Sequence, residues 1–138
     1  MTGLTFSDVN VGDDLPALDI EITPKLIVGA AIASRDYQNV HHDKAATQEL
    51  GSGDIFMNIL TTNGLVGRYV TDWAGPHAFL KKVSIKLGAP NYPGDNMKLT
   101  ATVTSTNKAD QVVELDVKGK NSFGYHVTGT VSVMLGYE

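Results

Sequence analysis

The sequence contains no cysteine, which excludes disulfide bonds, thiolate nucleophiles and zinc sites with cysteine ligands. No segment approaches the roughly 20 consecutive apolar residues of a membrane-spanning helix. The first residues, MTGLTFSDVNVGDD, contain neither the basic nor the apolar region of a signal peptide. Basic residues do not cluster beyond Lys81 and Lys82, so a nucleic-acid partner is not expected. These absences favour a soluble cytoplasmic protein.

The composition is that of a globular protein. Of the 138 residues, 42% are hydrophobic and 19% are charged, which is enough apolar material to form a core and too little charge for a disordered chain. The length suits one domain, and no linker, internal repeat or low-complexity segment interrupts it. We therefore expect residues 1–138 to form a single domain.

The first half of the sequence has helical features. Residues 23–35, TPKLIVGAAIASR, begin with Thr23 as a candidate N-cap and Pro24 at the first helical position. A short helix is predicted over 44–50, with Asp43 as its candidate N-cap.

A longer helix is predicted to follow Asp54, its candidate N-cap, and to end at WAGP, residues 73–76, because its apolar residues recur at helical spacing. Gly64 and Gly67 lie inside it, and each costs about 1 kcal/mol relative to alanine. The simplest explanation is close packing, in which a neighbouring backbone approaches the glycines.

The second half alternates apolar and polar residues, which is typical of strands with one buried face. Four strands are predicted, around residues 82–87, 97–104, 113–118 and 126–133. In this pattern His126 lies on the polar face of its strand, so its side chain is expected to be exposed. A curved antiparallel sheet wrapped around the long helix would satisfy both halves, which gives an α+β fold.

The segment RDYQNVHHD, residues 35–43, has the residue types of an acid–base site. Asp36 and His41 cannot meet on a regular helix or strand, but a turn between the two predicted helices can bring them together. A carboxylate and an imidazole that share one water form a general acid–base pair. Two other interpretations stay open: a polar loop with surface histidines, and a zinc site built on His41, His42 and Asp43.

The run ASRDYQNVHHDKAA, residues 33–46, resembles the signature of MaoC-like enoyl-CoA hydratases, S-G-D-x-N-P-[LIV]-H-x-[DE]-x-x-A. Six residues fit in register: Ser34, Asp36, Val40, His41, Asp43 and Ala46. The resemblance implies the hotdog fold, a long central helix wrapped by a curved sheet. Together with DIFMNILTTNGLVGRYVTDWAGP, residues 54–76, the run is most similar to the small catalytic subunits of heteromeric hydratases in actinobacterial steroid side-chain degradation.

The resemblance implies that Asp36 and His41 are the catalytic pair, which activates a water for addition to a trans-2-enoyl-CoA and gives a 3-hydroxyacyl-CoA. The thioester oxygen needs hydrogen-bond donors, and backbone N–H groups at the start of the central helix are suited to this. Gly53, Asp54 and Ile55 are the nearest candidates. No cofactor or metal is implied, because CoA is part of the substrate.

The chain departs from the family signature in the same segment. Arg35 replaces the glycine before the aspartate, Gln38 the asparagine, and Asn39 the proline, while GSGDIF replaces a His-Gly at the helix entrance. The steroid-type relatives have a similar loop. Phe56 and Ile59 are candidates for lining an apolar substrate pocket, as are Tyr69 and Trp73, although aromatic residues at helical spacing are more often in the core.

Other functions are compatible with the same fold. A hotdog thioesterase generally has an acidic residue on the central helix, and residues 55–71 contain none. An inactive MaoC-like partner or an acyl-CoA-binding module would not require the Asp36 and His41 pair. Because related enzymes form the acyl-CoA cleft between two hotdog units, we expect a second subunit, either a different MaoC-like protein or a second copy.

Overall fold

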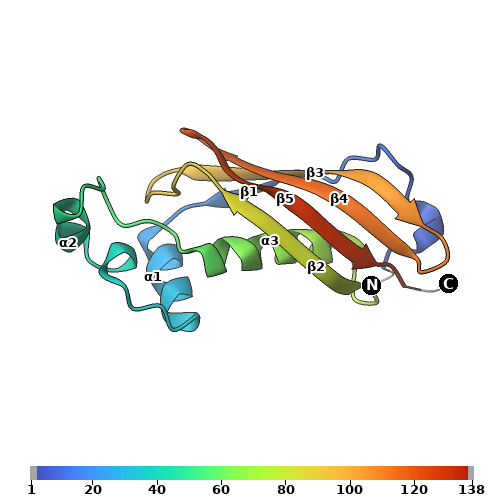
Figure 1. Ribbon diagram of the computed structural model, residues 1–138, viewed down its shortest axis with the longest axis horizontal. Coiled ribbons are helices and arrows are strands. Elements are labelled where there is room, and N and C mark those ends of the chain that lie inside the picture. The colour runs from blue at the N-terminus through green and yellow to red at the C-terminus, as the bar shows by residue number, and fades with distance from the viewer. Residues whose placement is uncertain (1–2, 137–138) are drawn as a thin grey trace.

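The structure is a computed structural model that describes residues 3–136, and it has the predicted α+β architecture (Figure 1). Two short 3-10 helices, η1 (Phe6–Asp8) and η2 (Asn39–His41), and three α-helices, α1 (Pro24–Ala33), α2 (Lys44–Glu49) and α3 (Ile59–Ala74), are present. The five strands are β1 (Leu18–Glu21), β2 (Phe79–Leu87), β3 (Asn96–Asn107), β4 (Val112–Asn121) and β5 (Gly124–Met134).

The strands form one antiparallel sheet in the order β1-β3-β4-β5-β2. It curves over α3, whereas α1 and α2 lie beyond one end of it (Figure 1). The core fills the space between sheet and helix. Its fully buried members include Val66 and Val70 of α3 and residues from the inner faces of the strands, among them Leu99, Leu115 and Val133. The predicted sheet wrapped around a long helix is confirmed.

The predicted N-caps of α1 and α2 are confirmed. Thr23 Oγ1 accepts the N–H of Leu26 at 3.0 Å at the start of α1, and Pro24 is the first helical residue. Asp43 Oδ1 accepts the N–H of Ala46 at 3.0 Å at the start of α2. Each cap satisfies an N–H group that the helix itself leaves without a partner.

The prediction that Asp54 caps the long helix is wrong, because α3 begins at Ile59 with Asn58 as its N-cap. The preceding residues are held in an extended path by two backbone hydrogen bonds. The N–H of Phe56 donates to the carbonyl of Val40 at 3.0 Å, and that of Met57 donates to the carbonyl of Asn91 at 3.1 Å. These partners are distant in the sequence, so local helical spacing could not reveal them.

Two further features differ from the sequence predictions. The strand β1 was missed, although Leu18, Ile20 and Ile22 alternate with acidic residues there. The glycines of α3 are not approached by a neighbouring backbone. A Cβ at Gly67 would lie 3.4 Å from Cδ2 of Leu80, whereas a Cβ at Gly64 would have no atom within 4 Å.

The prediction that His126 is exposed is wrong. Its side chain is 2% exposed, because the β4–β5 pairing shifts register between Gly119 and Lys120, and both His126 and Val127 turn inward. His126 Nδ1 donates to the carbonyl of Ala89 at 2.7 Å, and Nε2 lies 2.7 Å from Oγ1 of Thr62 on α3. Burial lowers the pKa of His126 below its usual value.

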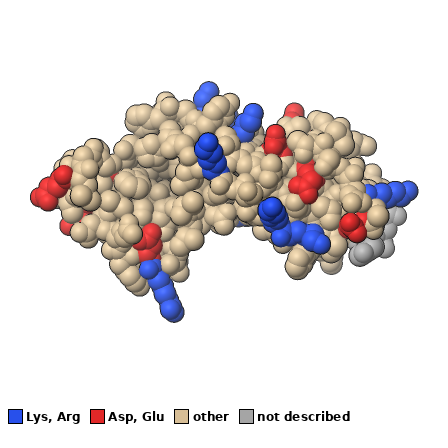
Figure 2. Space-filling view, in the orientation of Figure 1, with Lys and Arg blue, Asp and Glu red and all other residues tan. Residues whose placement is uncertain are grey.

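Charged side chains of both signs are scattered over the largely uncharged face seen in Figure 2. Within residues 3–136, no helix has both the length and the apolar character needed to cross a membrane.

Candidate active site

The site begins where α1 ends and the chain turns. Ser34 is the C-cap of α1, and Arg35 follows in the left-handed region with a φ of 56°. The N–H of Asp36 then donates to the carbonyl of Ala31 at 2.9 Å. A left-handed residue after a helix C-cap is usually glycine, which is the residue of the family signature at this position. The backbone at this position therefore has the left-handed conformation typical of glycine, although the residue is Arg35.

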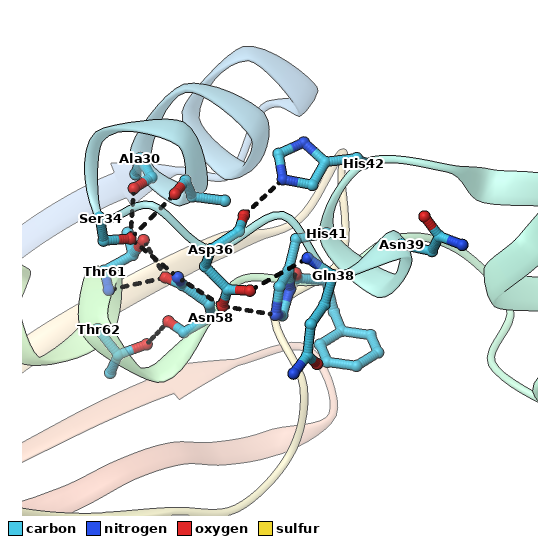
Figure 3. Close-up of polar contacts among 12 residues, drawn as sticks. Ala30, Ser34, Asp36, Gln38, Asn39, His41, His42, Asn58, Thr61 and Thr62 are labelled. Atoms are coloured by element: carbon cyan, nitrogen blue, oxygen red, sulfur yellow. Dashed lines mark hydrogen bonds and ion pairs between the residues drawn. The ribbon is translucent and has the colours of Figure 1, made fainter.

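The turn and η2 bring Asp36 and His41 together (Figure 3). Nε2 of His41 lies 3.2 Å from Oδ2 of Asp36. The side chain of His41 is 7% exposed and that of Asp36 is 23% exposed. The imidazole is therefore buried, and the carboxylate beside it is partly accessible to solvent. This is the convergence that the sequence predicted from a turn between two helices.

The backbone before α3 fixes the tautomer of His41. Nδ1 of His41 lies 2.6 Å from the carbonyl oxygen of Phe56. Because a carbonyl only accepts, Nδ1 carries a proton and donates it. Nε2 then faces the carboxylate of Asp36 at 3.2 Å, a hydrogen-bonding distance that leaves room for a proton but not for a water between the two atoms. The pair is therefore arranged to hold one exchangeable proton.

Asp36 is surrounded by hydrogen-bond donors. Nδ2 of Asn58 donates to Oδ2 of Asp36 at 3.1 Å, and the N–H of Gln38 donates to Oδ1 at 3.3 Å. The Asn58 hydrogen bond is the largest influence that lowers the pKa of Asp36 below its usual value, followed by the Gln38 N–H and by the charges of His41 and His42, against partial desolvation. Asp36 is therefore ionised at neutral pH.

The neighbouring histidine has a structural contact. Nε2 of His42 donates to the backbone carbonyl of Asp36 at 2.7 Å, so it closes the turn that carries the carboxylate. His41, His42 and Asp43 thus have three different partners and do not converge on a point. Among residues 3–136, no three His, Asp or Glu side chains are placed to hold a metal ion together.

The residues predicted to donate to the thioester oxygen do not begin the central helix. Gly53 and Asp54 lie in a bend before α3, and Ile55 follows them in the irregular segment that leads to Asn58. The N–H of Ile55 donates to Oδ1 of Asp54 at 2.7 Å, and Oδ2 of Asp54 forms an ion pair with Lys44 at 3.4 Å. The location assumed for them is corrected, and their role stays a prediction.

The predicted pocket residues occupy different surroundings. The ring of Phe56 meets that of His41 edge-on, with centroids 5.3 Å apart, and Ile59 is 52% exposed. Tyr69 is buried and donates its hydroxyl to the carbonyl of Pro16 at 2.8 Å. Tyr69 and Trp73 line a hollow against residues 16–18, separate from the pair.

An open apolar groove of about 350 Å³ runs between α1 and α3. Its lining residues are Leu26, Ala30, Ala33, Ser34, Leu60, Thr61, Gly64 and Leu65. It adjoins the pair through Ser34, whose Oγ accepts Nδ2–H of Asn58 at 3.1 Å. Sequence reasoning missed both Asn58 and this groove. Asn58 has the residue type of an N-cap, but its contact with Asp36 crosses 22 positions and has no local signature.

The chain belongs to the MaoC-like domain family, which residues 9–122 match. It is 46% identical over 125 residues to a protein of Mycobacterium tuberculosis (strain ATCC 25618 / H37Rv) named 3-oxo-4,17-pregnadiene-20-carboxyl-CoA hydratase beta subunit. That alignment covers 91% of this chain and 95% of the relative. The resemblance inferred from residues 33–46 and 54–76 is confirmed.

Solved structures agree with this assignment. A chain of the ChsH1–ChsH2 complex from Mycobacterium tuberculosis superposes with a TM-score of 0.88 at 46% identity, covering 91% of this chain and 98% of that one. The R-hydratase PhaJ1 of Pseudomonas aeruginosa gives a TM-score of 0.90 at 19% identity, covering 99% of this chain and 88% of that chain. The second likeness concerns the fold, which is the predicted hotdog.

Proposed function

We propose that this protein adds water to a trans-2-enoyl-CoA thioester and forms a 3-hydroxyacyl-CoA, with Asp36 and His41 as the catalytic residues. The observation that carries the proposal is the 3.2 Å approach of His41 Nε2 to Asp36 Oδ2 at the edge of a buried imidazole. The tautomer fixed by Phe56 supports it, because the proton-exchanging nitrogen is the one that faces the carboxylate.

The reaction requires two proton transfers, one to the Asp36 and His41 pair and one from it, so the pair has no net change in protonation. A water held by both side chains loses one proton to the pair while its oxygen forms the bond to C3. The pair returns one proton to C2, so the C2–C3 double bond is consumed and the pair is restored. Negative charge develops on the thioester oxygen during this step, and backbone N–H donors would stabilise it. Gly53, Asp54 and Ile55 are the proposed source of these donors, and the N–H of Ile55 would exchange its hydrogen bond with Oδ1 of Asp54 for one with the thioester oxygen.

The proposed substrate is the CoA ester of a steroid with a shortened, unsaturated side chain. The name of the 46% identical relative supports this choice. The apolar groove that adjoins Ser34 is the surface next to the pair that suits a large apolar acyl group. Phe56 beside His41, and the exposed Ile59, are proposed to contact that group.

We further propose that a second MaoC-like subunit, different from this chain, completes the enzyme. Large apolar side chains are exposed on α1, at the C-cap of α2, in the turn and at the start of α3: Ile32, Tyr37, Leu50, Ile59 and Leu60 are 51–73% exposed. Such a group of apolar side chains is typical of a surface that a partner covers. The solved ChsH1–ChsH2 complex supports a heteromer over a homodimer.

No cofactor is required in this proposal, because water and the CoA thioester supply every atom of the product. A cytoplasmic location is proposed with it, since CoA thioesters are intracellular substrates.

The test is a hydration assay on the purified chain, alone and with its candidate partner, using a steroid enoyl-CoA and the short crotonyl-CoA. Asp36→Asn and His41→Ala should each lower kcat/KM by about 10²-fold or more, because each removes one member of the acid–base pair. Circular dichroism and thermal unfolding establish that the variants fold.

Normal hydration by the two variants would mean that the turn is structural and that the chemistry belongs to another chain. Hydrolysis of the thioester in place of hydration would indicate a thioesterase. Turnover of crotonyl-CoA but not of the steroid ester would retain the hydratase and reject the proposed acyl group.

A further inference from the structure

Asn58 lies at the junction between α3 and the acid–base pair, and its side chain is almost fully engaged. It is 3% exposed. Nδ2 donates to Oδ2 of Asp36 and to Oγ of Ser34, both at 3.1 Å. Ser34 can accept this hydrogen bond because its own hydroxyl donates to the carbonyl of Ala30 at 2.8 Å. Both amide hydrogens therefore have defined acceptors (Figure 3).

The amide cannot be turned around. Oδ1 of Asn58 accepts the backbone N–H of Thr61 at 2.9 Å and the hydroxyl of Thr61 at 2.5 Å. A backbone N–H only donates, so the atom that faces it must be the amide oxygen, and the nitrogen must face Asp36. The N-cap of α3 thus fixes which atom of Asn58 meets the carboxylate.

This arrangement places a neutral donor against the oxygen of Asp36 that also faces His41. A hydrogen bond to the charged form of a carboxyl favours ionisation, and it is strong when the donor is buried and oriented. The same contact lowers the pKa of Asp36. A cationic donor would compete with His41 for the carboxylate, whereas a neutral amide holds the carboxylate in place without such competition.

We propose that Asn58 is a positioning residue for the reaction, which orients the Asp36 carboxylate toward His41 while also capping α3. The inference rests on the proposed function. It links the rigid end of the central helix to the reacting pair, so that the carboxylate position is set by α3 and by the turn together.

The decisive variants keep the cap and remove the amide. In Asn58→Ser the hydroxyl can still accept the N–H of Thr61 but cannot reach Asp36, and in Asn58→Asp an acceptor replaces the donor. Thr23→Ala is the matched control, because it removes an N-cap of similar geometry from α1 without touching the pair. Each variant is studied as the full chain in its assembled form.

Two readouts are needed, and the first is independent of activity. The pKa of the Asp36 carboxyl is measured by ¹³C NMR with only this chain labelled, and Asp36→Asn identifies the signal. Loss of one hydrogen bond to a charged group corresponds to about 1–2 pH units. The second readout is the pH profile of kcat/KM, in which the acidic limb should move upward by the same amount, with activity at pH 7 reduced roughly 10- to 100-fold.

The proposal is supported if the Asp36 pKa and the acidic limb of the pH profile both move upward in Asn58→Ser and Asn58→Asp. Neither quantity should move in Thr23→Ala. An Asp36 pKa that stays within about 0.3 unit of wild type would reduce Asn58 to a helix cap. If the Asp36 pKa moves but the acidic limb of the kcat/KM profile does not, the proposed role of Asn58 in the reaction is also overturned. If wild type hydrates no enoyl-CoA, the proposed function fails, and the NMR titration still decides whether Asn58 controls the carboxyl.

Discussion

Gly64 should be replaceable by alanine with a gain in stability of the isolated chain. The residue is exposed, lies in the interior of the 16-residue helix α3, and a Cβ there would meet no atom within 4 Å. Gly64 therefore destabilises the helix as any interior glycine does, and no close packing contact within the chain offsets this cost. We expect Gly64→Ala to raise the free energy of unfolding by about 1 kcal/mol.

For a chain of this length, a change of about 1 kcal/mol corresponds to an increase of about 3–5 °C in Tm. Urea unfolding gives the free energy directly, with an unchanged m-value as the sign that both states keep their compactness. Gly29→Ala is the matched control: Gly29 is an exposed glycine of α1, and a Cβ there also meets nothing within 4 Å. Gly67→Ala should gain less, because its Cβ would lie 3.4 Å from Leu80 Cδ2.

The reasoning would be refuted if Gly64→Ala destabilised the isolated chain while Gly29→Ala stabilised it. The same pair of variants should then be compared in the assembled enzyme. A gain for Gly64→Ala that is present in the free chain and absent in the assembly would mean that a partner or substrate contacts the α1–α3 groove at this position. Equal gains in both states would mean that Gly64 stays uncovered.

Two other predictions concern stability. His126 has a lowered pKa when folded, so the unfolded chain binds the proton more readily, and stability should fall as the pH decreases below about 6.5, by at most about 1.4 kcal/mol per pH unit. His126→Gln should lose this part of the pH dependence in urea unfolding between pH 7 and 5, and an unchanged slope would contradict the burial argument. Arg35→Gly should raise the free energy of unfolding by about 0.5–1 kcal/mol, because glycine adopts a φ of 56° without the strain of a side chain. Its kcat/KM should stay within a few-fold of wild type, and a large loss would show that the arginine side chain itself acts in the reaction.

Local sequence determined the elements whose partners are near in the chain. Thr23, Pro24 and Asp43 identified the starts of α1 and α2, since a cap bonds to an N–H three residues away. Alternation identified four strands, because side chains of a strand face opposite sides by geometry alone. In the segment 35–43, only a turn can join Asp36 and His41 at their spacing, and the resemblance of residues 33–46 to the MaoC-like signature selected these two among the open interpretations.

Tertiary structure decided what depends on distant partners. The helix α3 begins at Ile59 because the carbonyls of Val40 and Asn91 hold the preceding backbone in an extended path. His126 is buried because the β4–β5 pairing shifts register, which alternation within one strand does not reveal. Asn58 meets Asp36 only after α1, the turn and α3 have packed together. The sequence by itself thus determined the local elements and the turn that joins Asp36 and His41, the pair proposed to react, whereas long-range packing decided how that pair is held.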